Sequence, residues 1–185
     1  MLNQLDVALF RLINGRGIHP WLDAFGRAVD HPWWLWPPLV IVVGWLLVKG
    51  DRRTRVFVAA AVVAVALTDL LCAQLIKPLV ARVRPCVALE GVRLLVARKT
   101  SWSMPSNHAA NLTAAACVIG LYARRWLWLA VPATVLVSYS RIYVGVHYPL
   151  DVVVGAAVGA AVAVFAWPAV QAIDRRLPSR GVPRD

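Results

Sequence analysis

A stretch near the end of the chain combines an arginine, a histidine and an aspartate directly before a long apolar run. Arg141, His147 and Asp151 therefore lie at the mouth of the run 152–166, where ionisable groups are unfavourable unless they serve a function. Pro149 suits the first turn of a helix, because the N–H that proline lacks has no partner there. His147 would then precede this helix, and Asp151 would lie in its first turn. The carboxylate can bind one imidazole nitrogen and leave the other free to react.

Two earlier groups of polar residues supply what an anion site needs. Lys77 and Arg84 are separated by six residues, and Ser106, Asn107 and His108 precede or open another apolar run. Fixed cations around one point favour a multiply charged anion, and phosphate fits best. Backbone N–H groups at the start of a helix would add to such a site. The predicted phosphate-binding residues are Lys77, Arg84, Ser106, Asn107 and Arg141.

Two histidines beside a phosphate predict phosphoryl transfer through a covalent intermediate. His147, oriented by Asp151, is the expected nucleophile, and His108 is the expected proton donor to the leaving oxygen. Phosphoryl transfer depends on positioning and charge stabilisation, so the cations can take the place of a metal ion. No carboxylate cluster suited to magnesium is visible near these residues. We therefore predict a catalytic set of His147, His108 and Asp151 that uses no metal and no other cofactor.

The composition indicates an integral membrane protein. Hydrophobic residues make up 60% of the chain and charged residues 16%, against about 45–50% and about 25% in ordinary soluble domains. The net charge of +11 comes from basic residues in short loops between apolar runs, a pattern that argues against nucleic-acid binding. The three cysteines form no C-x-x-C pair, so neither a disulfide framework nor a zinc site is expected.

The apolar runs predict an all-α, polytopic membrane helix bundle of five to six transmembrane helices. An amphipathic N-terminal helix over residues 2–13 and a short helix from Pro20 to about His31 precede the bundle. We expect a single domain, 1–185, with an amphipathic segment 1–32, a catalytic region 77–151 and a basic cytoplasmic tail 171–185. The predicted spans are 33–48, 56–76, 108–123, 126 to about 138, and 150–170.

Alternating loops place the candidate site opposite the most compact basic segments. Each side of the membrane receives ten of the twenty Lys and Arg residues, but one set is packed into short loops and the tail. Basic loops of this kind favour the cytoplasmic side, so the site is expected to face outward across a bacterial inner membrane. The cytoplasmic set is Lys49, Arg52, Arg53, Arg55, Arg124, Arg125, Arg175, Arg176, Arg180 and Arg184.

Three motifs together resemble those of the type 2 phosphatidic-acid-phosphatase superfamily. They are Lys77-x6-Arg84-Pro85, Pro105-Ser106-x-His108 and Ser140-Arg141-x5-His147-x3-Asp151, in the order that the family shows. The resemblance implies a helical membrane fold and a metal-independent phosphohistidine mechanism. His147 would be the nucleophile with Asp151 as its partner, and His108 would act as acid and then as base for the hydrolytic water. Lys77, Arg84, Ser106 and Arg141 would hold the phosphate.

Two features depart from the family pattern. Asn107 stands where the motif commonly has glycine, and its side chain would narrow the site or hydrogen-bond a second phosphate. The family commonly has six spans where five are counted here, so the N-terminal segment would replace one.

The leading functional hypothesis is a lipid phosphatase that acts outside the cytoplasm on a membrane lipid phosphate or diphosphate. Undecaprenyl diphosphate is the first candidate, with phosphatidylglycerol phosphate and lipid A phosphate as close rivals. A lipid phosphotransferase would use the same intermediate, and a non-enzymatic lipid binder or transporter would need no Asp151. The sequence leaves the oligomeric state open.

The remaining charged and small residues receive structural interpretations. Asp69, within the second span, is expected to make a polar contact with the third span at Asn111 or Thr113. The four-residue spacing of Gly155, Gly159 and Ala163 predicts the close approach of another helix. Four cations match no motif position and are interpreted as solvated loop charges: Arg82, Arg93, Arg98 and Lys99.

Overall fold

The computed structural model describes residues 2–176, and every regular element in that range is helical. The predicted all-α fold is therefore confirmed, while Arg180, Arg184 and the end of the tail lie outside the described residues. The longer elements are α1 (Leu2–Gly15), α2 (Pro20–Asp30), α3 (Trp36–Lys49), α4 (Arg52–Leu70), α7 (Asn107–Tyr122), α8 (Leu127–Tyr143) and α9 (Pro149–Arg176). The shorter ones are η1 (Pro32–Trp34), η2 (Leu71–Ile76), α5 (Lys77–Val80), α6 (Pro85–Ala88) and η3 (Arg124–Trp126).

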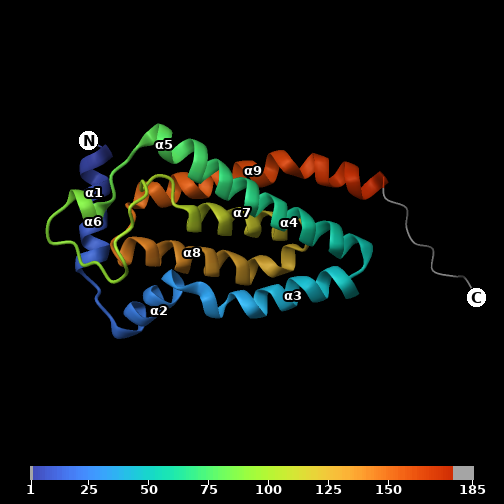
Figure 1. Ribbon diagram of the computed structural model, residues 1–185, viewed down its shortest axis with the longest axis horizontal. Coiled ribbons are helices and arrows are strands. Elements are labelled where there is room, and N and C mark those ends of the chain that lie inside the picture. Colours follow the sequence, from blue (N-terminus) through green and yellow to red (C-terminus); the bar gives the residue numbers. More distant parts are fainter. Residues whose placement is uncertain (1, 177–185) are drawn as a thin grey trace, which may run out of the picture.

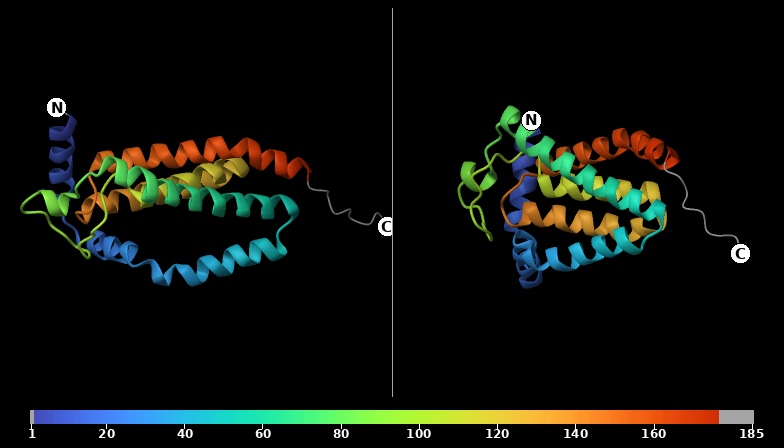
Figure 2. Two further views of the ribbon diagram at one scale, coloured as in Figure 1. Left: turned by 45° about the horizontal axis from the view of Figure 1, so that its top comes forward. Right: turned by 45° about the vertical axis from the view of Figure 1, so that its right-hand side comes forward.

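The predicted spans correspond to a bundle of elongated helices. α3, α4, α7, α8 and α9 run along the long axis of the molecule, while α1, α2 and α6 gather at one end (Figure 1). α7 lies at the centre and contacts α4, α8 and α9. Figure 2 shows α3 on one side of the bundle and α9 on the opposite side. α1 lies at the end of the bundle and does not run alongside it, so it supplies no sixth parallel helix among the described residues.

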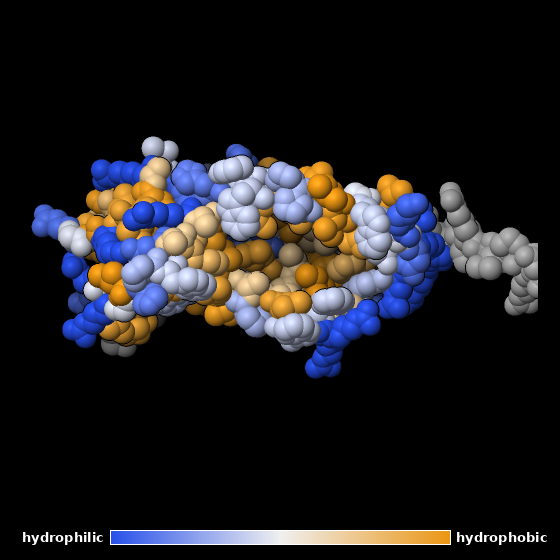
Figure 3. Space-filling view, turned by 90° about the horizontal axis from the view of Figure 1, so that it is seen from below, coloured by the Kyte–Doolittle hydropathy of each residue, from blue (hydrophilic) through white to orange (hydrophobic). Residues whose placement is uncertain are grey.

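Length and hydropathy identify two segments of the described chain that can cross a membrane. They are Arg52–Ala88 and Pro149–Arg176, and the shorter α3 is apolar as well. Hydrophilic residues gather at both ends of the molecule, and a hollowed apolar belt lies between them (Figure 3). Because the belt exposes large apolar side chains such as Phe165, at 83%, we describe the protein as integral to the membrane. The exact number of spans remains a prediction.

Two glycines let α9 pack tightly against α7. A Cβ atom at Gly159 would lie 2.1 Å from the carbonyl oxygen of Ala110, and one at Gly155 would lie 2.6 Å from that of Ser106. A side chain at either position of α9 would therefore collide with the backbone of residues 106–110. The predicted close approach is confirmed, with α7 as the neighbour, and it fixes the start of α7 beside the start of α9.

The second span is longer and less regular than the sequence suggests. We expected a polar loop from Lys77 onward, but the helix continues through the π-helical η2 and then α5. It ends at Ala81, whose φ of 47° is left-handed, a common way to terminate a helix. Lys77 is therefore held on a helix and is buried, with 8% of its surface exposed. A π segment changes the rotation of the residues after it, which the sequence pattern does not reveal.

α1 is amphipathic, but its polar side faces the protein. Asp6, Phe10 and Asn14 are buried at a spacing of four residues, whereas Leu5 and Leu9 are exposed. An exposed leucine stripe suits a helix at the membrane interface, where the apolar side meets lipid. The carboxylate and the amide on the buried side are then available to contact the end of the bundle.

The last span also extends further than predicted. α9 ends at Arg176, so residues 171–176 continue the helix and do not form a separate tail. Arg52 of α4 donates to the Asp174 carboxylate at 3.0 Å, which holds this end of α9 against α4.

Candidate active site

A cavity of about 160 Å³ lies where the start of α7, the end of α8 and the turn 144–148 meet. Six of the eight predicted site residues line it, and Ser106 and Asp151 lie directly behind, fully buried. The structure therefore brings together residues that are as much as 74 positions apart, from 77 to 151. The lining residues are Asp30, Lys77, Arg84, Lys99, Asn107, His108, Arg141, Val146 and His147.

His147 is held in one tautomer by its neighbours. Its Nδ1 lies 3.4 Å from Oδ2 of Asp151, and its Nε2 lies 3.2 Å from Nη1 of Arg84. An arginine can only donate, so Nε2 must be the acceptor and Nδ1 must carry the ring proton toward Asp151. Burial lowers the pKa of His147 to about 4, so the ring is uncharged near neutral pH. Nε2 thus keeps a lone pair, as a nucleophile requires.

Asp151 is fixed through both carboxylate oxygens. Oδ2 also accepts from the backbone N–H of Tyr148 at 2.9 Å, and Oδ1 accepts from Nη1 of Arg82 at 2.7 Å. Arg82 in turn donates to the Asp6 carboxylate at 2.5 Å and lies over the Tyr148 ring. The interpretation of Arg82 as a solvated loop charge is wrong. Its place two residues before Arg84 was the available signal, since residues two apart in an extended segment share a side.

Arg84 and Arg141 are oriented before any substrate binds. Arg84 donates to the carbonyl oxygens of Ser101 and Val146, at 2.7 and 2.8 Å. Arg141 donates from Nη2 to the Gly26 carbonyl oxygen at 2.8 Å and from Nη1 to Asp30 at 3.1 Å. Each guanidinium has five N–H groups, so donors remain for an anion. Lys77 has no hydrogen-bond partner among the described residues, and all three predicted cations reach the same cavity.

Gly26 explains how α2 reaches Arg141. A Cβ atom at this position would lie 2.5 Å from Cγ1 of Val144, so only glycine lets α2 approach the end of α8 this closely. No motif lies in this helix, and Gly26 was not among the predicted site residues.

Asp30 and Lys99 belong to the cavity and were missed. The Asp30 side chain is 1% exposed, and it accepts from Arg141 and, at 3.0 Å, from Lys99. The interpretation of Lys99 as a solvated charge is therefore wrong. Arg93 is likewise not free, since it pairs with Asp23 of α2. Of the four cations interpreted as solvated loop charges, Arg98 is the one that is exposed and has no partner among the described residues.

The start of α7 provides a hydroxyl for an anion. The Ser106 N–H donates to the Asp151 carbonyl oxygen at 2.9 Å. We expected this N–H to face the phosphate, but it is already taken. The Ser106 Oγ, in contrast, is buried and has no partner among the described residues. The N–H groups of the first helical turn have no acceptor within the helix and lie beside the cavity that Asn107 and His108 line.

The Asn107 side chain is engaged with α4. Its Nδ2 donates to Oδ1 of Asp69 at 2.8 Å, and Nδ2 of Asn111 donates to the same oxygen at 2.9 Å. The expected contact between Asp69 and Asn111 is thereby confirmed. One of the two N–H donors of the Asn107 amide is therefore bound to Asp69 in this structure.

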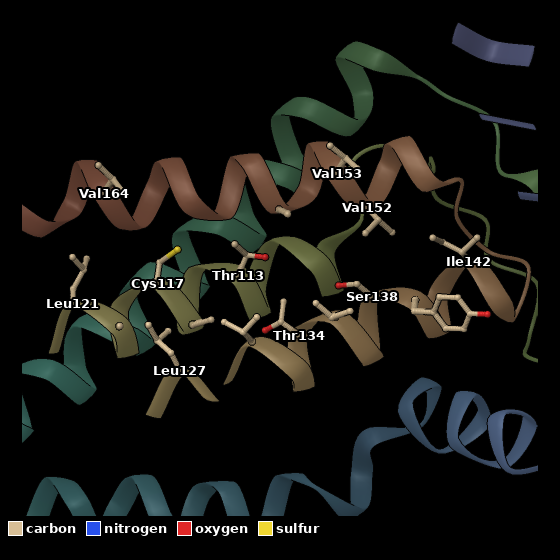
Figure 4. A pocket seen from close by; sticks show the side chains of 16 residues that line it. Thr113, Cys117, Leu121, Leu127, Thr134, Ser138, Ile142, Val152, Val153 and Val164 are labelled. Atoms are coloured by element: carbon tan, nitrogen blue, oxygen red, sulfur yellow. The ribbon is translucent and has the colours of Figure 1, made fainter. Parts of the chain in front are cut away.

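A larger apolar groove lies elsewhere in the bundle. It has a volume of about 750 Å³ and is lined by side chains of α7, α8 and α9, among them Thr134, Val152 and Val164 (Figure 4). It shares no lining residue with the charged cavity. The groove therefore belongs to the apolar belt and is separate from the small charged cavity.

The chain is similar in sequence and in fold to known membrane lipid phosphatases. Over 158 residues the chain is 34% identical to an undecaprenyl-diphosphatase of Sulfolobus acidocaldarius. The matched stretch covers 81% of this chain and 71% of the relative. The chain is also 32% identical to a lipid A 4'-phosphatase of Bacteroides thetaiotaomicron, over 85% of this chain and 73% of that protein. The crystal structure of a transmembrane PAP2 type phosphatidylglycerolphosphate phosphatase from Bacillus subtilis has the same fold. The two structures superpose with a TM-score of 0.68 at 22% sequence identity, and the superposition covers 97% of this chain and 89% of that chain.

The family comparison covers all three motifs. Residues 57–175 match the PAP2 superfamily, a range that includes every predicted site residue from Lys77 to Asp151. This match confirms the resemblance that the motifs indicated, and the chain belongs to the PAP2 superfamily.

Proposed function

We propose that this lipid phosphatase removes the terminal phosphate of a lipid diphosphate, with undecaprenyl diphosphate as the first candidate. The observation that carries the proposal is the state of His147, whose Nε2 is an acceptor in a cavity lined by cations. A relative of this chain bears the name undecaprenyl-diphosphatase, which supports the substrate. A lipid A phosphate and phosphatidylglycerol phosphate remain the rivals, since other relatives are named for them.

In the first step, His147 attacks the phosphorus atom. A bond forms between Nε2 and phosphorus while the bond from phosphorus to the leaving oxygen breaks. His108 donates a proton to that oxygen, so the lipid leaves with one phosphate fewer. Asp151 stabilises the positive charge that develops on the His147 ring, and Lys77, Arg84, Ser106 and Arg141 hold the phosphoryl oxygens.

In the second step, water hydrolyses the phosphohistidine. His108 now lacks its proton and accepts one from the attacking water, as microscopic reversibility requires. The new bond from oxygen to phosphorus forms as the bond to Nε2 breaks, which releases inorganic phosphate and restores both histidines. The cations supply the charge stabilisation, so we expect activity without an added metal ion.

We infer that the site faces away from the cytoplasm of a bacterial cell. The basic loops around residues 49–55 and 124–126 lie at the end of the bundle opposite the site (Figure 1). Positive loops favour the cytoplasmic side, which supports an outward-facing site on the inner membrane.

Phosphate release by the purified protein in detergent, with a chelator present, tests the proposal. The substrates are undecaprenyl diphosphate, phosphatidylglycerol phosphate, lipid A phosphate and phosphatidic acid. We expect the highest kcat/KM on the diphosphate and loss of at least about 10³-fold in His147→Ala. Release abolished by the chelator, or retained in His147→Ala, would contradict the mechanism. Transfer of the phosphate to another lipid would assign a phosphotransferase, and no turnover by the folded protein would point to a binder or transporter.

A further inference from the structure

Lys99 reaches the cavity from the loop between α6 and α7, outside the three motifs. Its Nζ lies 3.0 Å from Oδ2 of Asp30, and Oδ1 of the same carboxylate accepts from Arg141. Asp30 therefore holds two cations side by side on one wall of the cavity. Arg84 instead contacts His147 and has no hydrogen bond or ion pair with Asp30 among the described residues.

The charge of the cavity exceeds what one phosphate group requires. Four cations and one carboxylate line it, which leaves three net positive charges before the proton that His108 donates is counted. A single phosphate group carries about two negative charges at most near neutral pH. A lipid diphosphate carries about one more, so its charge matches the lining of the cavity more closely.

The position of Lys99 fits the second phosphate and not the first. The phosphoryl group under attack must lie against Nε2 of His147, and the leaving oxygen must point away from it because attack and departure are roughly in line. In a lipid diphosphate the second phosphate is attached to that oxygen. Lys99 contacts neither His147 nor Arg84 among the described residues, and its side chain is 37% exposed where that of Asp30 is 1% exposed. The other three cations that line the cavity are buried, so Lys99 is the most exposed of the four and lies toward solvent, the side from which a lipid can enter and leave.

We propose that Lys99, positioned by Asp30, binds the second phosphate of a lipid diphosphate and so favours diphosphates over monophosphates. The ammonium group has three N–H donors, so it can keep Asp30 and still donate to a phosphate oxygen. The same contact stabilises the leaving phosphate as charge develops on its oxygen. This inference rests on the proposed function and adds to it a residue that discriminates between substrate classes.

The test compares two substrates that differ only in one phosphate, undecaprenyl diphosphate and undecaprenyl phosphate. For Lys99→Gln we expect kcat/KM on the diphosphate to fall about 10- to 100-fold, as for loss of a hydrogen bond between charged groups. On the monophosphate the fall should be less than about threefold. Lys99→Arg, which keeps the charge and the donors, should retain most of the preference for the diphosphate.

Arg98→Gln is the matched control, because Arg98 is the neighbouring cation of the same loop and is exposed without a described partner. It should leave the ratio of the two kcat/KM values unchanged. An equal loss on both substrates in Lys99→Gln would show that Lys99 only stabilises Asp30 and Arg141, and would overturn the inference. The same selective loss in Arg98→Gln would overturn it too, since general attraction would explain both.

The outcomes separate the inference from the function on which it rests. If the unmodified protein hydrolyses phosphatidylglycerol phosphate or lipid A phosphate but not the diphosphate, the lipid phosphatase assignment stands and the role of Lys99 is refuted. If the folded protein releases phosphate from none of these lipids, the proposed function itself fails.

Discussion

At the residue scale, the reactivity of His147 follows from the two groups that contact its ring. Burial lowers the pKa of His147 to about 4, and the nearby Arg84 and Lys77 act in the same direction, while Asp151 opposes them. The free imidazole has a pKa of about 6.5, so the folded protein keeps the neutral ring over a wider acidic range. We expect His147 to stay uncharged from neutral pH down to about 4.

Imidazole ¹⁵N NMR of the protein in detergent micelles measures this directly, with His147→Gln to identify the signal. The neutral ring should show a protonated Nδ1 and an unprotonated Nε2, and it should titrate near pH 4. A midpoint near 6.5, or a proton on Nε2, would contradict the proposed nucleophile. If the ring titrates near pH 4 as expected, any activity lost between pH 7 and 5 belongs to other groups, such as the substrate phosphate.

The residues proposed to bind the phosphate are predictable because phosphoryl transfer restricts their types and spacing. Lys77, Arg84 and His147 could be assigned from the motifs and do line one cavity. Asp30 and Arg82 match no motif position and were not assigned, because each pairs with another side chain and many positions in the chain can supply such a contact. Buried ion pairs of this kind depend on which helix ends meet, and the sequence alone does not determine that.

At the element scale, α1 contacts the residues around Asp151, the proposed partner of His147. Asp6 binds Arg82 through Oδ2 and accepts from the Leu150 N–H through Oδ1 at 2.8 Å, at the start of α9. Asp151 lies in the same turn of α9 and shares Arg82 with Asp6. α1 thus helps to orient Asp151, although none of its residues lines the cavity.

We expect Asp6→Asn to lower kcat about tenfold with little change in KM, because Arg82 loses a charged partner while the phosphate contacts stay intact. Gln4→Ala, on the exposed side of α1, is the control and should behave as the unmodified protein. A double-mutant cycle with Arg82→Gln should show that the two losses do not add. Additive losses, or a change in KM alone, would show that α1 does not act through Arg82.

The elements themselves were predicted more reliably than their orientation. Apolar runs of the right length identified the bundle helices, and Pro149 marked the start of α9 as expected. The burial of the polar side of α1 was not foreseen, because the polar side of a helix at the membrane interface can face water as well as protein. The π-helical segment before Lys77 was also missed, since a π turn leaves no periodic signal in the sequence.

At the scale of the whole molecule, charge is divided between the two ends of the bundle. One end holds the cavity with α1, α2 and the loop 89–106, and the other holds the basic turns that follow α3 and α7 (Figures 1 and 3). An apolar belt separates them, so the bilayer must leave one end on each side. The cavity can then meet lipid phosphates from one leaflet only, and its side determines which lipids are substrates.

Labelling of single cysteines in intact bacterial cells determines that side. The three natural cysteines are first replaced by serine or alanine, and one cysteine is then introduced by Glu90→Cys at the site end or by Lys49→Cys at the other end. Both positions are exposed, so a membrane-impermeant maleimide can reach either one from its own side. We expect the cysteine at position 90 to react in intact cells and that at position 49 only after lysis. The reverse pattern would place the cavity in the cytoplasm, where a lipid diphosphate released on the outer leaflet could not reach it, and would favour a lipid phosphate made on the inner leaflet.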